Sequence, residues 1–206
     1  MTPLETLGYV LGTSFASGLN LYATVAAAGL LERFGLIHLP QSLHILANPL
    51  VLGIAAVLFV IEFIADKVPY VDSVWDAVHT FIRPPAAVFL SYTAFSGNVP
   101  EEWRIGAALL AGSVALTSHG AKATTRAAVN ASPEPFSNWT LSTAEDGLAV
   151  LLAWLAAAHP LVTGVVAVLL VVLALLLIRR FFGLLRRLVT RLGGRSSGPT
   201  PVSAKT

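Results

Sequence analysis

The chain has 206 residues, of which 55% are hydrophobic and only 12% are charged. A soluble domain carries about 25% charged residues, so this composition argues against a water-soluble globular protein and favours one embedded in a lipid bilayer. The formal net charge is +2 and there is no cysteine, which excludes disulfides and thiolate metal sites. Because the arginines gather near the C-terminus, no basic face remains for nucleic acid.

The first apolar segment predicts a helix that is too long for one straight crossing. Thr2 to Glu5 form a capping box, and apolar residues continue to about Leu31. Some 30 residues give about 45 Å of helix, against a hydrocarbon core of about 30 Å. The segment contains Ser17 and Gly18, followed by Asn20. These residues predict a break near its middle.

Two further helices complete the first half of the chain. Asn48 precedes a proline and opens a helix that is expected to end near Ala65. A capping box at residues 73–76 is expected to open a third helix, which extends to about Phe95. Arg83 is followed by two prolines inside this helix, which predicts an interruption there.

The second half predicts a similar series. One long helix covers about residues 100–130 and contains a small polar cluster at residues 118–120, where we expect a second break. A capping box at residues 142–145 predicts a helix over 143–158, preceded by a loop at 131–139. Residues 161–178 carry no charge and are the strongest predicted span.

The two series predict an all-α membrane protein with about six transmembrane helices in two inverted three-helix repeats. The repeats would occupy residues 1–97 and 98–180, with a broken first and fourth helix. An odd number of spans in each half gives the halves opposite topology, an arrangement common in transporters. Residues 181–206 predict a basic amphipathic helix along the membrane surface, followed by a disordered tail.

Several short strings resemble a known family. They are SGLN at 17–20, EFIADKVP at 62–69, HTFIRPP at 79–85, SPEPFSNW at 132–139 and AED at 144–146. Together they resemble the bacterial membrane family called domain of unknown function 4126, over about residues 5–180. The resemblance implies a multi-pass protein of the bacterial inner membrane and no particular activity. With six spans and the basic residues on one side, both termini are predicted to be cytoplasmic.

The polar residues inside the predicted spans form the candidate site. Broken helices expose backbone groups that can hold an ion, and charges deep in a bilayer need partners. Glu62 is expected to pair with Arg83 or Lys122. The residues predicted to bind a transported ion or small polar solute are Ser17, Gly18, Asn20, Glu62, Asp66, Arg83, Ser118, His119, Gly120 and Lys122.

Three functions stay open, with a small transporter or channel-like protein favoured over an enzyme. The second is a membrane-embedded enzyme acting on a lipid, in which Asp66, Asp72, Asp76 and His79 would hold a metal. The third is a structural or assembly factor whose polar residues only bond helix to helix. We expect the bilayer and a small ion or solute as partners, no nucleic acid, no cofactor, and a possible homodimer.

Other polar residues have simpler expected roles. Asp72, Asp76, Glu145 and Asp146 suit helix N-termini. Arg126 is expected to extend to the membrane interface, as long basic side chains do near helix ends.

Overall fold

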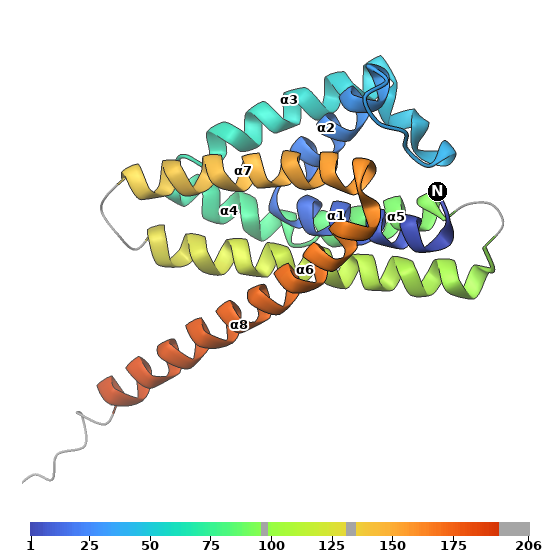
Figure 1. The fold of residues 1–206 in the computed structure, drawn as a ribbon. Helices are drawn as coiled ribbons and strands as arrows, with labels where there is room; N and C mark the ends of the chain where they lie inside the picture. Colours follow the sequence, from blue (N-terminus) through green and yellow to red (C-terminus); the bar gives the residue numbers. More distant parts are fainter. Residues whose placement is uncertain (96–98, 131–134, 194–206) are drawn as a thin grey trace, which may run out of the picture.

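The computed structural model describes residues 1–95, 99–130 and 135–193. All the regular secondary structure in these residues is helical (Figure 1). The elements are α1 (Pro3–Leu19), α2 (Leu21–Arg33), the 3-10 helix η1 (Gln41–Ala47), α3 (Pro49–Ala65), α4 (Pro69–His79), α5 (Arg83–Ala94), α6 (Glu101–Asn130), α7 (Pro135–Ala158) and α8 (Pro160–Gly193).

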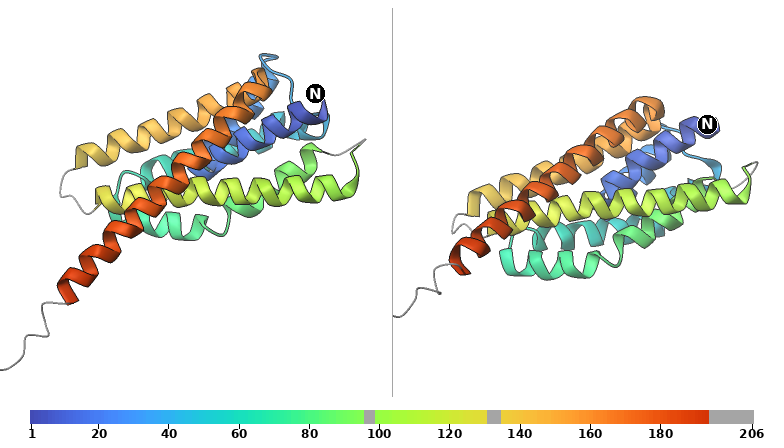
Figure 2. Two further views of the ribbon diagram at one scale, coloured as in Figure 1. Left: turned by 60° about the horizontal axis from the view of Figure 1, so that its bottom comes forward. Right: turned by 90° about the horizontal axis from the view of Figure 1, so that it is seen from below.

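The first long segment is a helical hairpin. It breaks at Asn20, as the sequence predicts, but the chain reverses there instead of continuing across the bundle (Figures 1 and 2). Tyr9 and Thr13 of α1 line one cavity together with Val25 and Ala28 of α2, so the two helices extend from Asn20 on either side of that cavity. The outer ends of both helices therefore lie at the same end of the bundle, which differs from a single kinked crossing.

If α4 and α5 are taken together as one segment, the helices from α3 to α8 extend along the bundle in alternating directions (Figure 1). Asn48 accepts a hydrogen bond from the backbone NH of Leu50, and α3 ends at Ala65 as predicted. The next helix starts at Pro69, so the capping box at residues 73–76 lies inside α4 and the predicted start there is wrong. The interruption at Arg83 is confirmed, because α4 ends at His79 and α5 begins at Arg83.

The second predicted break is wrong. Helix α6 is continuous from Glu101 to Asn130, through Ser118, His119 and Gly120. The polar side chains of Ser118 and His119 bind groups on other elements, so no free backbone is needed to satisfy them. The predicted repeat was based on a match between the first long segment, now α1–α2, and α6. Because the chain reverses between α1 and α2 but not within α6, the described residues do not show a repeat at these helices.

The last two helices are longer than predicted. Helix α7 begins at Pro135, so the capping box at residues 142–145 and the second half of the predicted loop are wrong, while 131–134 lie outside the described residues. Helix α8 continues through the basic stretch to Gly193 and extends beyond the other helices (Figures 1 and 2). The predicted tail over 194–206 lies outside the described residues.

In the part of the chain that the structure describes, two helices are long and apolar enough to cross a membrane: Phe136–Ala158 and Pro160–Arg191. A third candidate is η1 with α3, bent by 64°, if the pair counts as one span. Large apolar side chains cover the outer surfaces of α3 and α8, for example Ile54, Val57, Leu169 and Leu173, each more than half exposed. A surface of that kind is suited to lipid contact.

Candidate functional site

The tip of the α1–α2 hairpin lies inside the protein and is the centre of the site. Asn20 is fully buried; its side-chain oxygen accepts a hydrogen bond from the backbone NH of Ala23 at 2.8 Å and so caps α2. Its amide nitrogen donates to Oδ1 of Asp146 on α7 at 2.8 Å. One side chain thus closes the start of α2 and ties the tip to a neighbouring helix.

The end of α1 supplies backbone acceptors to two cations. The last carbonyls of a helix have no partner within it and carry the negative end of its dipole. Arg83 Nη1 donates to the carbonyl of Gly18 at 2.9 Å, and Lys122 Nζ donates to that of Leu19 at 3.1 Å. Both cations are almost completely buried. A helix that ends inside the protein therefore provides part of the environment that stabilises two buried charges.

Arg83 links the tip to α3, α4 and α6. Its Nη2 donates to Glu62 Oε1 at 2.5 Å, and its Nη1 donates to Nδ1 of His119 at 2.7 Å. Oδ1 of Asp76 lies 3.6 Å from Nη1. Lys122 Nζ also lies 3.5 Å from Glu62 Oε1. The prediction that Glu62 pairs with Arg83 or Lys122 is confirmed, and it pairs with both.

Arg126 forms a second centre one turn further along α6. Lys122 Nζ donates to Asp66 Oδ2 at 2.8 Å, and Arg126 Nη2 reaches the same oxygen at 3.1 Å. Arg126 also binds Glu145 Oε2 through Nε and Nη2, and Asn138 Oδ1 at 2.6 Å. It is 2% exposed, so the expectation that it extends to the interface is wrong.

Two buried histidines, His79 and His119, are held by hydrogen bonds that define which ring nitrogen carries the proton. Arginine only donates, so Nδ1 of His119 accepts and its Nε2 carries the proton, which faces the carbonyl of Asp76 and the hydroxyl of Thr80. Nδ1 of His79 donates to the carbonyl of Trp75 at 2.8 Å, and its Nε2 lies 3.1 Å from the hydroxyl of Tyr22. All four ring nitrogens thus have partners.

We call the buried charged side chains around the hairpin tip the buried charge network. It contains six buried carboxylates and only three buried cations among the described residues. The carboxylates are Glu62, Asp66, Asp72, Asp76, Glu145 and Asp146, and the cations are Arg83, Lys122 and Arg126. Oε2 of Glu62 and Oδ1 of Asp66 are buried without a hydrogen-bond partner in the described structure. The network therefore has more negative groups than the protein's buried cations match.

One further cation lies at the edge of the network. Lys67, in the turn between α3 and α4, has its Nζ 3.3 Å from the ring centroid of Phe63 and 3.3 Å from Oγ of Ser142. Partial burial lowers the pKa of the Lys67 ammonium, and the nearby Asp146 carboxylate opposes that shift. A lysine that is only partly buried reduces the excess of negative charge without removing it.

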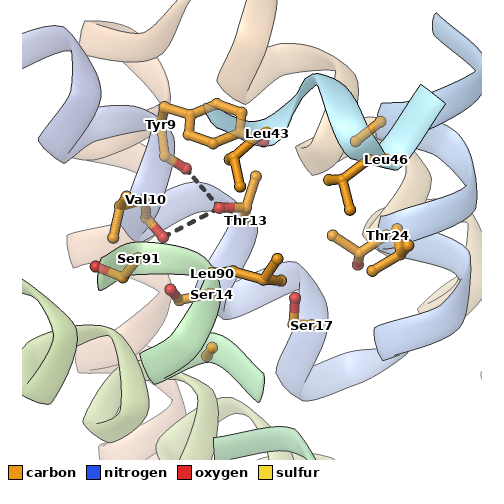
Figure 3. Close-up of a pocket in the computed structure, with 13 residues that line it drawn as sticks. Tyr9, Val10, Thr13, Ser14, Ser17, Thr24, Leu43, Leu46, Leu90 and Ser91 are labelled. Carbon is orange, nitrogen blue, oxygen red and sulfur yellow. Dashed lines mark hydrogen bonds between the residues drawn. The ribbon is translucent and has the colours of Figure 1, made fainter. Parts of the chain in front are cut away.

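A small cavity lies beside the network, between α1, α2, η1 and α5 (Figure 3). Its volume of about 20 Å³ is enough for roughly one water molecule. Most of its lining is apolar, but Ser14, Ser17, Thr24 and Ser91 bring hydroxyls to it. The hydroxyls of Ser17 and Ser91 are buried and have no hydrogen-bond partner in the described structure.

The structure gathers most of the ten predicted site residues, but in different roles. Glu62, Asp66, Arg83, His119 and Lys122 belong to the network, and Gly18 and Asn20 form the hairpin tip that contacts it. The remaining three lie elsewhere. Ser17 lines the cavity, the hydroxyl of Ser118 donates to the carbonyl of Phe15, and Gly120 faces Ile178 of α8, which a Cβ at this position would contact.

The sequence analysis assigned five network residues to helix caps or to the membrane interface: Asp72, Asp76, Arg126, Glu145 and Asp146. Asp146 lies well inside α7, far from either helix end, and so does Glu145. The signal that would have found Glu145 and Asp146 is two adjacent carboxylates in a segment apolar enough to span a membrane.

The residues of the predicted metal site do not come together as metal ligands. In the described part of the chain, no group of three or more histidine or acidic side chains is placed to hold a metal ion. Asp66 Oδ2 is bound to Lys122 and Arg126, and the ring nitrogens of His79 have other partners. The geometry therefore gives no support to a lipid enzyme that uses this metal.

The fold and the site together define an all-helical protein with apolar helices of membrane-spanning length around a buried charge network. The chain belongs to the family described as domain of unknown function (DUF4126), whose model matches residues 7–180. That range contains the whole buried charge network. Comparison with curated proteins and with solved structures gave no match.

Proposed function

We propose that this protein is a small transporter or channel-like protein that moves a proton or another small cation across the bacterial inner membrane. The observation that carries the proposal is the buried charge network, in which six carboxylates face three cations. Burying unmatched carboxylates in a low-dielectric interior is costly, so they gain by taking up protons or a small cation. Glu62 and Asp66, each with one unpartnered oxygen, are the sites we propose for that exchange.

The hairpin tip supports the proposal. Interrupted helices that end inside a membrane protein are a recurring way to place helix dipoles and free carbonyls beside an ion. Here the ends of α1 and α2 meet at Asn20, next to Arg83 and Lys122. The two cations would provide the counter-charge. A water in the cavity at Ser17 would extend the polar path from the network along the hairpin.

The membrane arrangement that we propose differs from six crossings. With the bundle axis along the membrane normal, α3, α4 with α5, α6, α7 and α8 each cross once, and the α1–α2 hairpin enters and leaves at one face. This gives five crossings and opposite sides for the two termini, in place of both termini in the cytoplasm. The turn between α3 and α4, which contains Lys67, lies at the same end of the bundle as the C-terminal end of α8, which carries exposed arginines (Figure 1). By the positive-inside rule, that end would be cytoplasmic.

Flux into proteoliposomes tests the proposal. The purified protein should pass protons or a monovalent cation, driven by a potassium diffusion potential and followed with an internal pH or ion indicator. Glu62→Gln and Asp66→Asn should each reduce the flux at least 10-fold while the protein stays folded. Glu101→Gln is the matched control, since Glu101 is exposed at the start of α6. No flux above empty liposomes for any ion tested would refute transport.

A structural role is the second candidate, and one observation favours it. Each of the three buried cations binds groups from at least two other elements, so the network also joins the helices. Polar side chains contribute to helix association in membranes in this way. If this is the only role, Glu62→Gln would lower thermal stability and abundance, and the wild-type protein would carry no flux.

A further inference from the structure

The basic end of α8 has a pattern that the transport proposal does not use. Five arginines lie between residues 179 and 191, all exposed: Arg179, Arg180, Arg186, Arg187 and Arg191. The chain has no aspartate or glutamate after Asp146, so this segment holds no acid that could pair with them. Their counter-charge must come from outside the segment.

The arginines occupy one side of the helix. At 100° per residue they fall within an arc of about 140°. The apolar residues Phe181, Phe182, Leu184, Leu185, Leu188 and Val189 fall within the opposite arc of about 160°, and the two arcs do not overlap. Apart from Phe181, which is half-buried, these apolar side chains are exposed. The segment is therefore strongly amphipathic, with neither face covered by the protein.

The length of α8 places this segment at the membrane surface. Residues 161–178 are uncharged and give about 27 Å of helix, close to the thickness of a hydrocarbon core. Arg179 then reaches the headgroups. If α8 continued straight, the apolar arc would extend into water. Lying in the interface, the same helix would bury that arc and keep the arginines beside the lipid phosphates.

The geometry points to a binding surface for anionic phospholipid headgroups on residues 179–191, which we call the arginine face. All five cations are arginine and none is lysine. The guanidinium group donates two parallel hydrogen bonds, which match the oxygens of a phosphate. In the lipid-bound state, residues 179–191 bend away from the axis of α8 and lie along the cytoplasmic leaflet. This inference requires only that α8 spans the bilayer and does not depend on transport.

The absence of native cysteine allows a direct test with the full chain. Leu188→Cys, on the apolar arc, would carry an environment-sensitive fluorophore, and Thr190→Cys, among the arginines, would be the matched control. The protein would be placed in nanodiscs of phosphatidylcholine, with or without phosphatidylglycerol. We expect a blue shift and protection from a water-soluble quencher at residue 188 only with phosphatidylglycerol, reversed by salt, and no protection at residue 190.

Charge variants separate this inference from simple apolar insertion. Replacing Arg186 and Arg187 together by glutamine should lower the equilibrium constant for the lipid-bound state about 25-fold, since one basic residue at an anionic surface contributes about 5-fold. Replacing both by lysine should preserve most of the binding. Three results would each overturn the inference: a label in water in both lipids, equal insertion without phosphatidylglycerol, or protection that appears only with two copies per disc.

Discussion

Removing the guanidinium of Arg83 gives the most direct test of the buried charge network. Arg83→Met keeps an apolar side chain of similar length but leaves Glu62 with only Lys122, at 3.5 Å. It also removes the donor to the carbonyl of Gly18 and to Nδ1 of His119. Breaking one partner of a buried ion pair costs about 3–5 kcal/mol, because the other charge stays buried. For a protein of this size, that corresponds to a fall in melting temperature on the order of 10 °C.

The double variant Arg83→Met/Glu62→Met should recover part of this loss. With both charges gone, no unpaired carboxylate is left at this position, and apolar replacements of a buried pair are often neutral. The two hydrogen bonds to Gly18 and His119 are still missing, at about 1 kcal/mol each. We therefore expect the double variant to be about 2 kcal/mol less stable than the wild type, and more stable than Arg83→Met alone.

Unfolding in mixed micelles of mild detergent and dodecyl sulfate measures these differences. Arg104→Met is the control: Arg104 donates to the carbonyl of Tyr92 at 3.2 Å and stacks on its ring, outside the network. Its loss should cost about 1 kcal/mol. Equal effects of Arg83→Met and Arg104→Met, or a double variant as unstable as the sum of its single changes, would refute the coupling between Arg83 and Glu62.

Two further predictions test the hairpin and its direction. Gly18→Ala should destabilise the protein by at least 2 kcal/mol, because a Cβ there would overlap the backbone of α6. Gly53→Ala, on the outer face of α3, has open space around the new Cβ and should be neutral or slightly stabilising. The melting temperatures of the two variants, compared with the wild type, test this difference. In the cysteine-free chain, Thr2→Cys should react with an impermeant thiol reagent only from the periplasmic side and Arg191→Cys only from the cytoplasmic side; reaction of both from one side would contradict five crossings.

The helix ends show how far local sequence signals reach. Thr2 and Asn48 cap α1 and α3 as predicted, because each has an extended backbone and its side chain accepts a hydrogen bond from the first turn of the helix that follows. Ser142 has an equally good capping sequence, yet α7 has already begun at Pro135 and the hydroxyl of Ser142 accepts from Lys67 instead. A capping box marks a start only if the preceding residues are not already helical, and local sequence does not decide that.

The two expected breaks differ for a long-range reason. Both Asn20 and the 118–120 cluster interrupt an apolar segment with polar residues. At Asn20 the freed carbonyls of α1 find Arg83 and Lys122, so the break is compensated. In α6 the hydroxyl of Ser118 donates to α1 across the interface, and the helix keeps its own hydrogen bonds. Residues 65 to 103 positions away decide between these outcomes, and periodicity alone contains no information about them.

The same reasoning explains why the charge network was only half predicted. Glu62 and Arg83 stood out because each is a charge within an apolar segment, where a partner is required. Arg126, Glu145 and Asp146 lie near signals that offered a cheaper explanation, a helix end or an interface. In the fold these three side chains are brought to the hairpin tip and its neighbours. A charged residue that could cap a helix or reach the interface can therefore still be buried in an ion pair.

The position of the hairpin also bears on how an ion could pass. The α1–α2 tip contacts the network from one side, and the cavity at Ser17 lies along the hairpin on that side. On the other side, Asp72 Oδ2 accepts from Asn130 Nδ2 near the end of α6, at the opposite end of the bundle. Under the proposed function, a cation or proton that entered along the hairpin would meet the carboxylates of the network before it reached Asp72. Since Arg83 and Lys122 bind both the tip and the carboxylates, taking up a positive charge at Glu62 or Asp66 would weaken their hold on the carboxylates. Uptake of the ion and the position of the hairpin tip would then be coupled, because Arg83 and Lys122 bind both the carboxylates and the carbonyls of the tip.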